Sequence, residues 1–336
     1  MNNKFRMKQI AHICILTIGM LNLCQSPKNL NQLLNSEYEQ KIISSGDNFP
    51  KISLFENDRD KFLIGLHNGF DKIELKENLG WTDDELNEEI SVLIENGFLQ
   101  LRDNKPVPSI CIIMQEEGQK MFQQSESVAN KIVESLTEIE PQIKELFNEM
   151  KASEFVKYSD FKFFLFSDVL LDNWQINNVE ESFLQKQRTL RHGKRYYLKI
   201  AEKDTASKIE VFGIYGNQYN CKDSTCFITY GNNRLNNKLS FNQLSEIDIP
   251  FISISDQVIL EKMAELYKPK LIDTLNKHRE LFFNNYNISV YKNELSFEEY
   301  FIWYYHFLYT KATDILNERE VIEIPENGIY RVQLER

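Results

Sequence analysis

The fold of this chain is decided by residues 58–122, which read DRDKFLIGLHNGFDKIELKENLGWTDDELNEEISVLIENGFLQLRDNKPVPSICIIMQEEGQKMF. Three segments with helical spacing of apolar residues come first. Two strand-like runs, 98–101 and 110–114, then flank the turn RDNKPVPS, and another helix begins at Gln115. The third segment has defined ends, because Thr82 and Glu85 have the spacing of a capping box and a glycine follows the last apolar position. The apolar stripes are Leu63, Leu66 and Phe70, then Ile73, Leu75 and Leu79, then Leu86, Ile90, Leu93 and Ile94.

This order of three helices and a two-stranded wing resembles a winged helix-turn-helix domain. Such domains bind DNA, and the resemblance implies that the third helix enters the major groove. That helix, however, carries no Lys or Arg, and residues 56–95 contain 12 acidic against 4 basic side chains. Its acids are Asp83, Asp84, Glu85, Glu88, Glu89 and Glu95. Acids at this position repel a DNA duplex, so the sequence predicts a scaffold or protein-contact module, with no nucleic acid as a partner.

The first 24 residues have the pattern of a signal peptide. A basic segment, residues 4–8, precedes an uncharged and mostly apolar run of 15 residues, which is too short for a stable transmembrane helix. The run ends in LNLC, and this ending resembles a bacterial lipoprotein signal with Cys24 as the lipidated residue. We therefore expect a protein of the cell envelope of a Gram-negative bacterium, either anchored to the membrane by a lipid on Cys24 or periplasmic. The alternative is a buried N-terminal helix of a cytoplasmic protein.

The length of the chain indicates how many domains it has, and its charge limits the partners that it can bind. Its 336 residues suggest about two domains. The net charge is −11, with 39 Lys and Arg against 50 Asp and Glu, and it becomes −14 once the three basic residues of the leader are removed. Such a balance opposes nonspecific binding to nucleic acid or anionic lipid. We expect a signal peptide at 1–24, a linker at 25–57, a winged-helix-like domain with a trailing helix at 58–153 and an α+β domain at 154–336.

The trailing helix carries apolar residues at near-heptad spacing between residues 121 and 150. Such a stripe has two possible partners. It could pair two copies of the chain in a homodimer, or it could pack against the next domain of its own chain.

The α+β domain is rich in aromatic residues, and the whole chain has 23 Phe and 15 Tyr. Short β-rich runs at 196–200, 208–216 and 226–231 predict a small antiparallel sheet. Two long helices are expected at 256–283 and from Phe297, where the second is apolar nearly all round and should be buried. The tail from residue 321 to 334 contains Glu-Asn-Gly and predicts a hairpin.

Cysteine spacing predicts one disulfide. Cys221 and Cys226 enclose four residues, which is too wide for a redox or zinc CxxC motif and suits a bridge across a short turn in an oxidising compartment. Cys111 lies in an apolar run and is expected to be an inert buried thiol.

One histidine is a candidate for catalysis. His306 lies in the middle of the aromatic helix, and Glu299 lies seven residues before it on the same face. A carboxylate beside a buried imidazole can tune it to act as a general base. The alternative is a core histidine that bonds a hydroxyl or a backbone carbonyl. No metal-ligand motif, glycine-rich phosphate loop or nucleophile motif occurs, so neither a metal nor another cofactor is expected.

The chain has one basic cluster, LQKQRTLRHGKRYYLK at residues 184–199. Arg188, Arg191 and Arg195 could bind a small anionic ligand, since guanidinium groups bind carboxylate or phosphate in a bidentate manner, and Tyr196 could stack on a ring. The alternative is a solvated turn, or a face that forms salt bridges with the acidic first domain.

Three hypotheses about function remain from the sequence. In the first, the chain is an exported, lipid-anchored protein that binds a partner protein or a small anionic ligand, without catalysis. In the second, it is a cytoplasmic winged-helix transcription regulator with a ligand-sensing C-terminal domain. In the third, it is a hydrolase with its site around His306.

Overall fold

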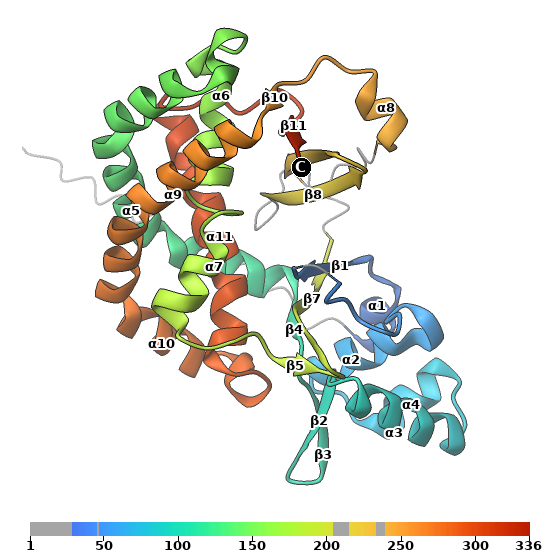
Figure 1. Ribbon diagram of the computed structural model, residues 1–336. Helices are drawn as coiled ribbons and strands as arrows, with labels where there is room; N and C mark the ends of the chain where they lie inside the picture. Colours follow the sequence, from blue (N-terminus) through green and yellow to red (C-terminus); the bar gives the residue numbers. More distant parts are fainter. Residues whose placement is uncertain (1–28, 46, 204–214, 233–238) are drawn as a thin grey trace, which may run out of the picture.

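The computed structural model describes residues 29–45, 47–203, 215–232 and 239–336, and it shows an α+β protein of long helices and small sheets (Figure 1). The expected leader, including Cys24, lies outside the described residues, and so does most of the strand expected at 208–216. Among the described helices, none has the length and apolar character needed to cross a membrane.

The N-terminal part begins with regular structure where a linker was expected. Helix α1 spans Leu30–Asn35, and strand β1 spans Tyr38–Ile43. Strand β1 pairs antiparallel with β7 (Tyr197–Glu202) along its whole length. The segment 25–57, which was expected to be a linker, thus contains a helix and a strand that belongs to a sheet. The sequence shows no strand alternation here, because every residue of β1 is half-buried and its two faces are alike.

Three helices and a hairpin follow. They are α2 (Arg59–His67), preceded by a 3-10 turn η1 (Glu56–Asp58), α3 (Lys72–Leu79), α4 (Asp83–Glu95), β2 (Leu99–Arg102) and β3 (Lys105–Pro108). The capping box at the start of α4 forms as expected, because Glu85 N donates to Thr82 Oγ1 at 3.2 Å and Thr82 N donates to Glu85 Oε2 at 2.7 Å. The hairpin differs from the expectation, since β2 pairs with β3 rather than with the run at 110–114.

That run instead forms β4 (Cys111–Ile113), which joins the sheet β1-β7-β4 as a parallel neighbour of β7. Strand β7 lies in the middle of this sheet and is buried throughout. Its side chains alternate between two hydrophobic cores. Leu198 and Ile200 pack into the first core with α1, α2 and α4, whereas Tyr197 and Ala201 pack into the second, larger core. One strand therefore forms a wall of both cores.

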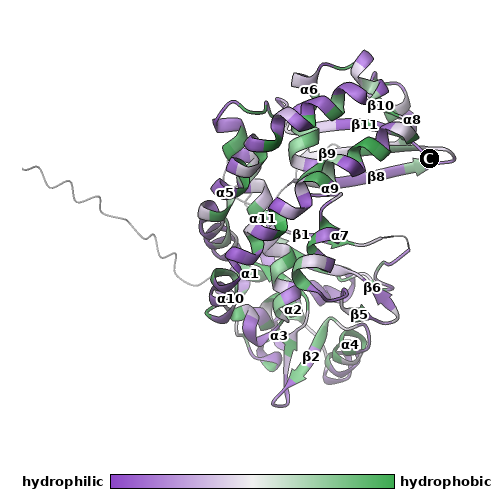
Figure 2. Cartoon of the chain, turned by 60° about the vertical axis from the view of Figure 1, so that its left-hand side comes forward, coloured by the Kyte–Doolittle hydropathy of each residue, from purple (hydrophilic) through white to green (hydrophobic). Residues whose placement is uncertain are grey.

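The second core is built by three long helices, α5 (Gln115–Glu149), α9 (Ile254–Lys277) and α11 (Phe297–Glu318). Hydrophobic and hydrophilic residues are mixed along α5 and α9 (Figure 2), and both helices bury apolar residues in this core, although Val258 and Leu266 of α9 stay exposed. The apolar stripe of α5 at 121–150 is buried against α9 and α11 of the same chain, which is the second of the two arrangements considered from sequence. Because α5 belongs to the second core, the cores do not divide at residue 153, where the domain boundary was expected.

Helix α11 is buried from Tyr300 to Thr310 on all sides, as its composition predicts. The helix expected at 256–283 starts earlier, at a Ser253 cap, and is divided into α9 and α10. The remaining elements around these helices are η2 (Lys151–Glu154), α6 (Tyr158–Phe163), the π-helix η3 (Phe164–Val169), α7 (Ile176–Asn178), the π-helix η4 (Val179–Leu184), β5 (Leu190–Arg191), β6 (Lys194–Arg195), α10 (Arg279–Asn287) and η5 (Val290–Asn293).

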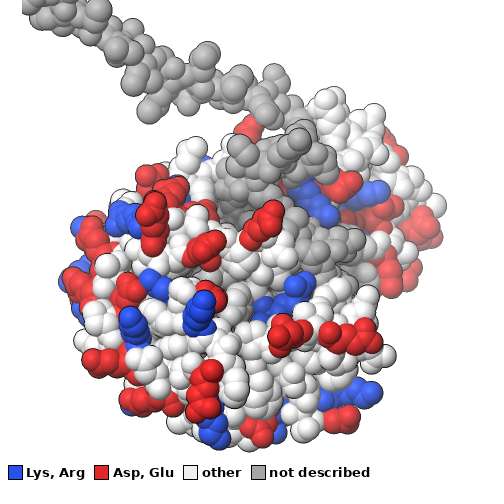
Figure 3. Space-filling view, turned by 90° about the horizontal axis from the view of Figure 1, so that it is seen from above, with Lys and Arg blue, Asp and Glu red and all other residues white. Residues whose placement is uncertain are grey.

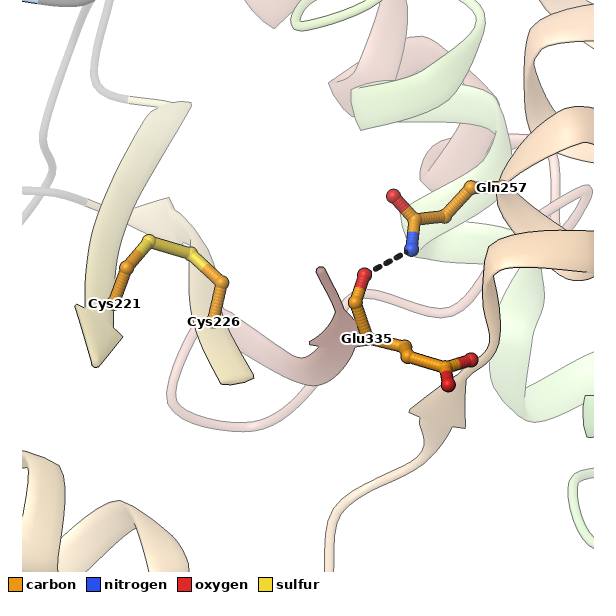
Figure 4. Close-up of a disulfide and its surroundings, with 4 residues drawn as sticks. All are labelled: Cys221, Cys226, Gln257 and Glu335. Carbon is orange, nitrogen blue, oxygen red and sulfur yellow. Dashed lines mark hydrogen bonds between the residues drawn. A yellow bond between two sulfur atoms is a disulfide. The ribbon is translucent and has the colours of Figure 1, made fainter. Parts of the chain in front are cut away.

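A second sheet has the described strand order β10-β11-β9-β8, with β10 (Phe251–Ile252), β11 (Ile329–Glu335), β9 (Thr225–Asn232) and β8 (Tyr215–Lys222), and α8 (Phe241–Ser245) lies near β8. The expected disulfide is confirmed, since Cys221 and Cys226 are bonded across the β8–β9 hairpin (Figure 4). The hairpin expected at 321–334 does not form, because only β11 is a strand and it pairs with β9 and β10 instead. Gln257 Nε2 of α9 donates to Glu335 O at 2.6 Å and fixes the end of β11 (Figure 4).

A buried ionic cluster joins the two cores. His67, the last residue of α2, lies between Glu294 and Glu117, with its Nδ1 at 2.7 Å from Glu294 Oε2 and its Nε2 at 3.1 Å from Glu117 Oε2. The His67 side chain is 1% exposed. Tyr291 OH donates to Glu117 Oε2 at 2.9 Å and to Ile112 O of β4 at 2.8 Å. The cluster thus connects α2 and β4 with α5 and the segment before α11.

The charges of His67 and the two glutamates alter one another's pKa values. Burial of the His67 ring by itself would lower its pKa, but the carboxylates of Glu117 and Glu294 outweigh this effect and raise the pKa from 6.5 to about 10. Burial tends to raise the pKa of Glu117, yet the charge of His67 holds it below its usual value. Burial dominates at Glu294 and raises the pKa of that carboxyl. Near neutral pH, His67 is therefore an imidazolium held by two glutamates.

This cluster predicts a loss of stability in mildly alkaline solution. Because the His67 pKa is raised, its contribution is complete below pH 6.5 and is lost as pH rises through about 10. We expect the free energy of unfolding to fall between pH 7 and 10, by up to about 1.4 kcal/mol for each pH unit. Urea unfolding at several pH values measures this slope. The double variant His67→Gln/Glu294→Gln, which keeps hydrogen-bonding groups, should show a flatter dependence, and equal slopes in both proteins would contradict the assignment.

Candidate functional site

A polar surface pocket of about 590 Å³ lies where three parts of the chain meet. The loop after β1 contributes Ser45 and Asn48, and α7 and η4 contribute Asn177, Glu180 and Glu181. The segment between η4 and β5, together with β6, completes the lining with Gln185, Lys186, Gln187, Arg188 and Arg195. Two of the four ligand-binding residues predicted from the basic cluster, Arg188 and Arg195, therefore lie in one pocket.

Arg188 is fixed in the wall of this pocket. Its Nε donates to Glu180 Oε1 at 2.7 Å and its Nη2 donates to Glu180 Oε2 at 3.1 Å, which is a bidentate pair. The guanidinium lies over the ring of Tyr197, 5.8 Å from its centroid, and the side chain is 10% exposed. Its Nη1 has no hydrogen-bond partner among the described residues. The charge of Arg188 is thus neutralised, and its role is to shape and stiffen the pocket.

Arg195 is exposed, and its charge has no carboxylate partner among the described residues. Its Nη1 donates to Arg188 O at 2.7 Å, and its backbone N donates to Asn48 Oδ1 at 3.1 Å, so it is anchored at the pocket. Within the described part of the chain, no carboxylate forms an ion pair with Arg195, whereas Lys186 is paired with Glu298 at 3.0 Å. Arg195 is consequently the lining cation that is best able to meet an anionic ligand.

The other two predicted ligand residues lie in the interior, and their assignment to a ligand site is not supported. Arg191 is 1% exposed, and its Nη1 and Nη2 donate to Tyr196 O at 2.9 Å and Ser109 O at 2.8 Å. Its Nη2 also lies 3.0 Å from Glu299 Oε1 of α11. The Tyr196 ring belongs to the first core and is 2% exposed. Arg191 therefore links the backbone at Ser109, between β3 and β4, to Glu299 of α11, as a second ionic contact between the cores.

The two residues of the catalytic hypothesis, Glu299 and His306, each have other hydrogen-bond partners. Glu299 is bound by Arg191 and by Thr189, whose Oγ1 donates to Glu299 Oε2 at 2.8 Å. Burial raises the pKa of Glu299, and Arg191 only partly offsets this. His306 Nδ1 donates to Ile302 O at 2.8 Å, and burial together with the charge of Lys199 lowers the pKa of His306 to about 3. His306 is thus a neutral core histidine that bonds a backbone carbonyl, as in the alternative considered from sequence.

The β2–β3 hairpin and α4 make contacts that the sequence did not reveal. Gln100 Nε2 of β2 donates to Glu294 O at 2.5 Å, and Arg102 Nη1 donates to Lys292 O at 3.3 Å, so the β2–β3 hairpin is held against η5. Of the acids of α4, Glu89 is buried and pairs with Arg59 at 2.6 Å. The others, Asp83, Asp84, Glu85, Glu88 and Glu95, are exposed.

Most residues of the pocket could not be predicted from the sequence. Asn48 and Asn177 have no local pattern that marks them, since they reach the pocket only through the pairing of β1 with β7 and the packing of α7. Glu180 had a weak signal, because it lies eight residues before Arg188 and carries the opposite charge. Acidic and basic side chains are interspersed over the face seen in Figure 3. In the described residues, no group of three or more His, Cys, Asp or Glu side chains is placed to hold a metal.

Comparison with known proteins gives no further assignment. No protein-family model, curated protein or solved structure matches this chain.

Proposed function

We propose that this chain is an exported protein, anchored to a membrane by a lipid on Cys24, that acts by binding a partner protein or a small anionic ligand. Two features support export. The leader has a basic segment and an apolar run that ends at a lipoprotein-like cysteine. The Cys221–Cys226 disulfide fits an oxidising compartment, where such bonds persist.

We further propose that α2, α3, α4 and the β2–β3 hairpin are a winged-helix-like module reused as a scaffold. The order of the elements supports the likeness. In a DNA-binding winged helix, the hairpin and the third helix contact DNA. Here the hairpin is bound to η5 through Gln100 and Arg102, and the exposed face of α4 is acidic, which supports a scaffold role. A wing and a third helix in this state cannot follow a DNA backbone, because DNA binding requires cations that face phosphates.

The ligand part of the proposal rests on the pocket. Its volume of about 590 Å³ lies in the range of small-molecule sites, and its lining is polar. Arg195 offers a charged hydrogen-bond donor that forms no ion pair with a carboxylate of the described residues. Four amide side chains of the lining add neutral donors and acceptors: Asn48, Asn177, Gln185 and Gln187. This combination favours a compact ligand with a carboxylate or phosphate group, held by Arg195 and oriented by the amides.

Export and anchoring predict a specific effect of the substitution Cys24→Ala. We expect the unaltered protein in the membrane fraction and the variant as an uncleaved precursor or a protein released from the membrane, because no acyl chain can be attached to alanine. Fractionation and mass measurement of the mature N-terminus report the outcome, with Cys14→Ala as the matched control that should stay membrane-bound. A cytoplasmic location of both proteins, together with salt-dependent retention on DNA, would favour the transcription-regulator hypothesis instead.

The pocket predicts a loss of anion affinity in Arg195→Gln. Citrate, a compact carboxylate, serves as the probe in isothermal titration calorimetry at low ionic strength. We expect at least about tenfold weaker binding in the variant, since a hydrogen bond to a charged group contributes about 1.5–3 kcal/mol. Lys105→Gln removes an exposed cation on β3, away from the pocket, and should bind citrate as the unaltered protein does. Equal affinities in all three proteins would exclude Arg195 as the anion contact.

A further inference from the structure

Two buried aspartates lie apart from the pocket, where the aromatic core meets the second sheet. Asp168 belongs to the π-helix η3, and Asp172 follows one turn later, with its backbone N donating to Asp168 O at 3.0 Å. They are 0% and 5% exposed. In the described structure, no Lys, Arg or His side chain forms an ion pair with either carboxylate. Two carboxylates buried without a cation are costly, so this arrangement calls for a compensating partner.

Asn217 of β8 brings the two carboxylates together. Its Nδ2 lies 2.8 Å from Asp168 Oδ1 and 3.3 Å from Asp172 Oδ2. Two further oxygens at this place, Asp168 Oδ2 and Asn217 Oδ1, are buried without a hydrogen-bond partner among the described residues. Unpartnered buried oxygens are rare in folded proteins, and a bound ion is one of the usual reasons for them.

The orientation of the Asn217 amide matters, because its oxygen and nitrogen have nearly the same shape and can exchange places by a half-turn. After such a turn, Oδ1 would take the position of Nδ2, at 2.8 Å and 3.3 Å from the two carboxylate oxygens. Oδ1 has no hydrogen bond to lose, but the turn removes the two bonds that Nδ2 donates to Asp168 and Asp172, so a cation must take the place of those donated protons between the three oxygens. Neighbouring oxygens in an octahedral shell lie roughly 2.9 Å apart around Mg²⁺ and roughly 3.4 Å apart around Ca²⁺, from the usual metal–oxygen distances.

We propose that Asp168, Asp172 and Asn217 bind one divalent cation of the Mg²⁺ or Ca²⁺ class. The two carboxylates balance the charge of the ion, and the amide oxygen adds a neutral ligand of the kind that such hard cations prefer. The set holds two carboxylates and an amide, so it differs from the His, Cys, Asp and Glu clusters typical of transition metals. The ion stabilises the packing of β8 on η3, because its ligands come from both elements.

Two features of the surroundings fit this role. Asn217 is only partly buried and lies on β8, which is an edge strand of its sheet in the described residues, so an ion and its remaining water ligands can reach the site from that edge. The π-helical turn of η3, in which Leu170 N donates to Leu165 O at 2.9 Å, places Asp168 in the core beside Ser167. Such π-turns are frequent at functional sites.

Terbium luminescence and thermal unfolding test the proposal on the full chain after treatment with EDTA. Tb³⁺ replaces Ca²⁺ and emits when a nearby tyrosine absorbs, and Tyr309 and Tyr230 surround the site. We expect sensitised emission that Ca²⁺ or Mg²⁺ displaces, and a midpoint of unfolding that rises with the concentration of the displacing ion. The ion that displaces terbium at the lower concentration identifies the preferred cation. Asp168→Asn, which keeps the shape of the side chain, should weaken binding by more than tenfold.

The matched control is Asp160→Asn, which removes an exposed carboxylate from the preceding helix α6 and should bind terbium like the unaltered protein. Should Asp168→Asn fail to fold, Asp172→Asn provides the same comparison. The proposal is overturned if the unaltered protein shows neither sensitised emission nor an ion-dependent midpoint. It is equally overturned if Asp160→Asn and Asp168→Asn bind terbium alike, since the ion would then lie elsewhere on this acidic protein.

Discussion

Strand β7 is the constraint on which the rest of the structure depends. It is the middle strand of the sheet β1-β7-β4, and its alternate side chains enter two different hydrophobic cores. A strand shared in this way cannot leave one core without exposing the other, because Tyr197 and Ala201 are buried on one side of it and Leu198 and Ile200 on the other. The N-terminal helices and the aromatic helical body are therefore parts of one packed unit rather than domains joined by a flexible linker.

Two ionic contacts strengthen this union beside the strand. His67 is held between Glu117 and Glu294, and Arg191 joins backbone carbonyls of the N-terminal part to Glu299 of α11. Breaking either contact would leave a buried charge unpaired, which costs far more than losing a surface salt bridge. The β2–β3 hairpin is also joined to the helical body, because Gln100 and Arg102 donate hydrogen bonds to backbone carbonyls at η5. Residues 58–108, whose sequence resembles a winged helix, are thereby held on the helical body. Helix α4 within this segment contains no Lys or Arg that could contact DNA phosphates.

Local signals predicted the local structure well. The capping box of α4, the stop at Gly97, the disulfide across the β8–β9 hairpin and the buried character of α11 all follow from short-range chemistry that the sequence carries directly. Long-range pairing was not predictable in this way. Strand β1 has no alternation, because its two faces are alike, and β11 was expected to pair within its own tail whereas it pairs with β9. In the basic cluster, Arg188 and Arg195 line the pocket, as a ligand site would require. Arg191 has the same sequence signal but is buried and binds groups inside the protein.

The shared strand requires the two cores to unfold together, and native-state hydrogen exchange at increasing urea measures whether they do. Amides of α2 report on the first core, and amides of α11 report on the second. The shared strand predicts that the slowest amides of both helices exchange with the same free energy of opening and the same urea dependence, because both require global unfolding. If α2 opens at a clearly lower free energy while α11 stays protected, the N-terminal module unfolds independently and the account of a single unit is wrong.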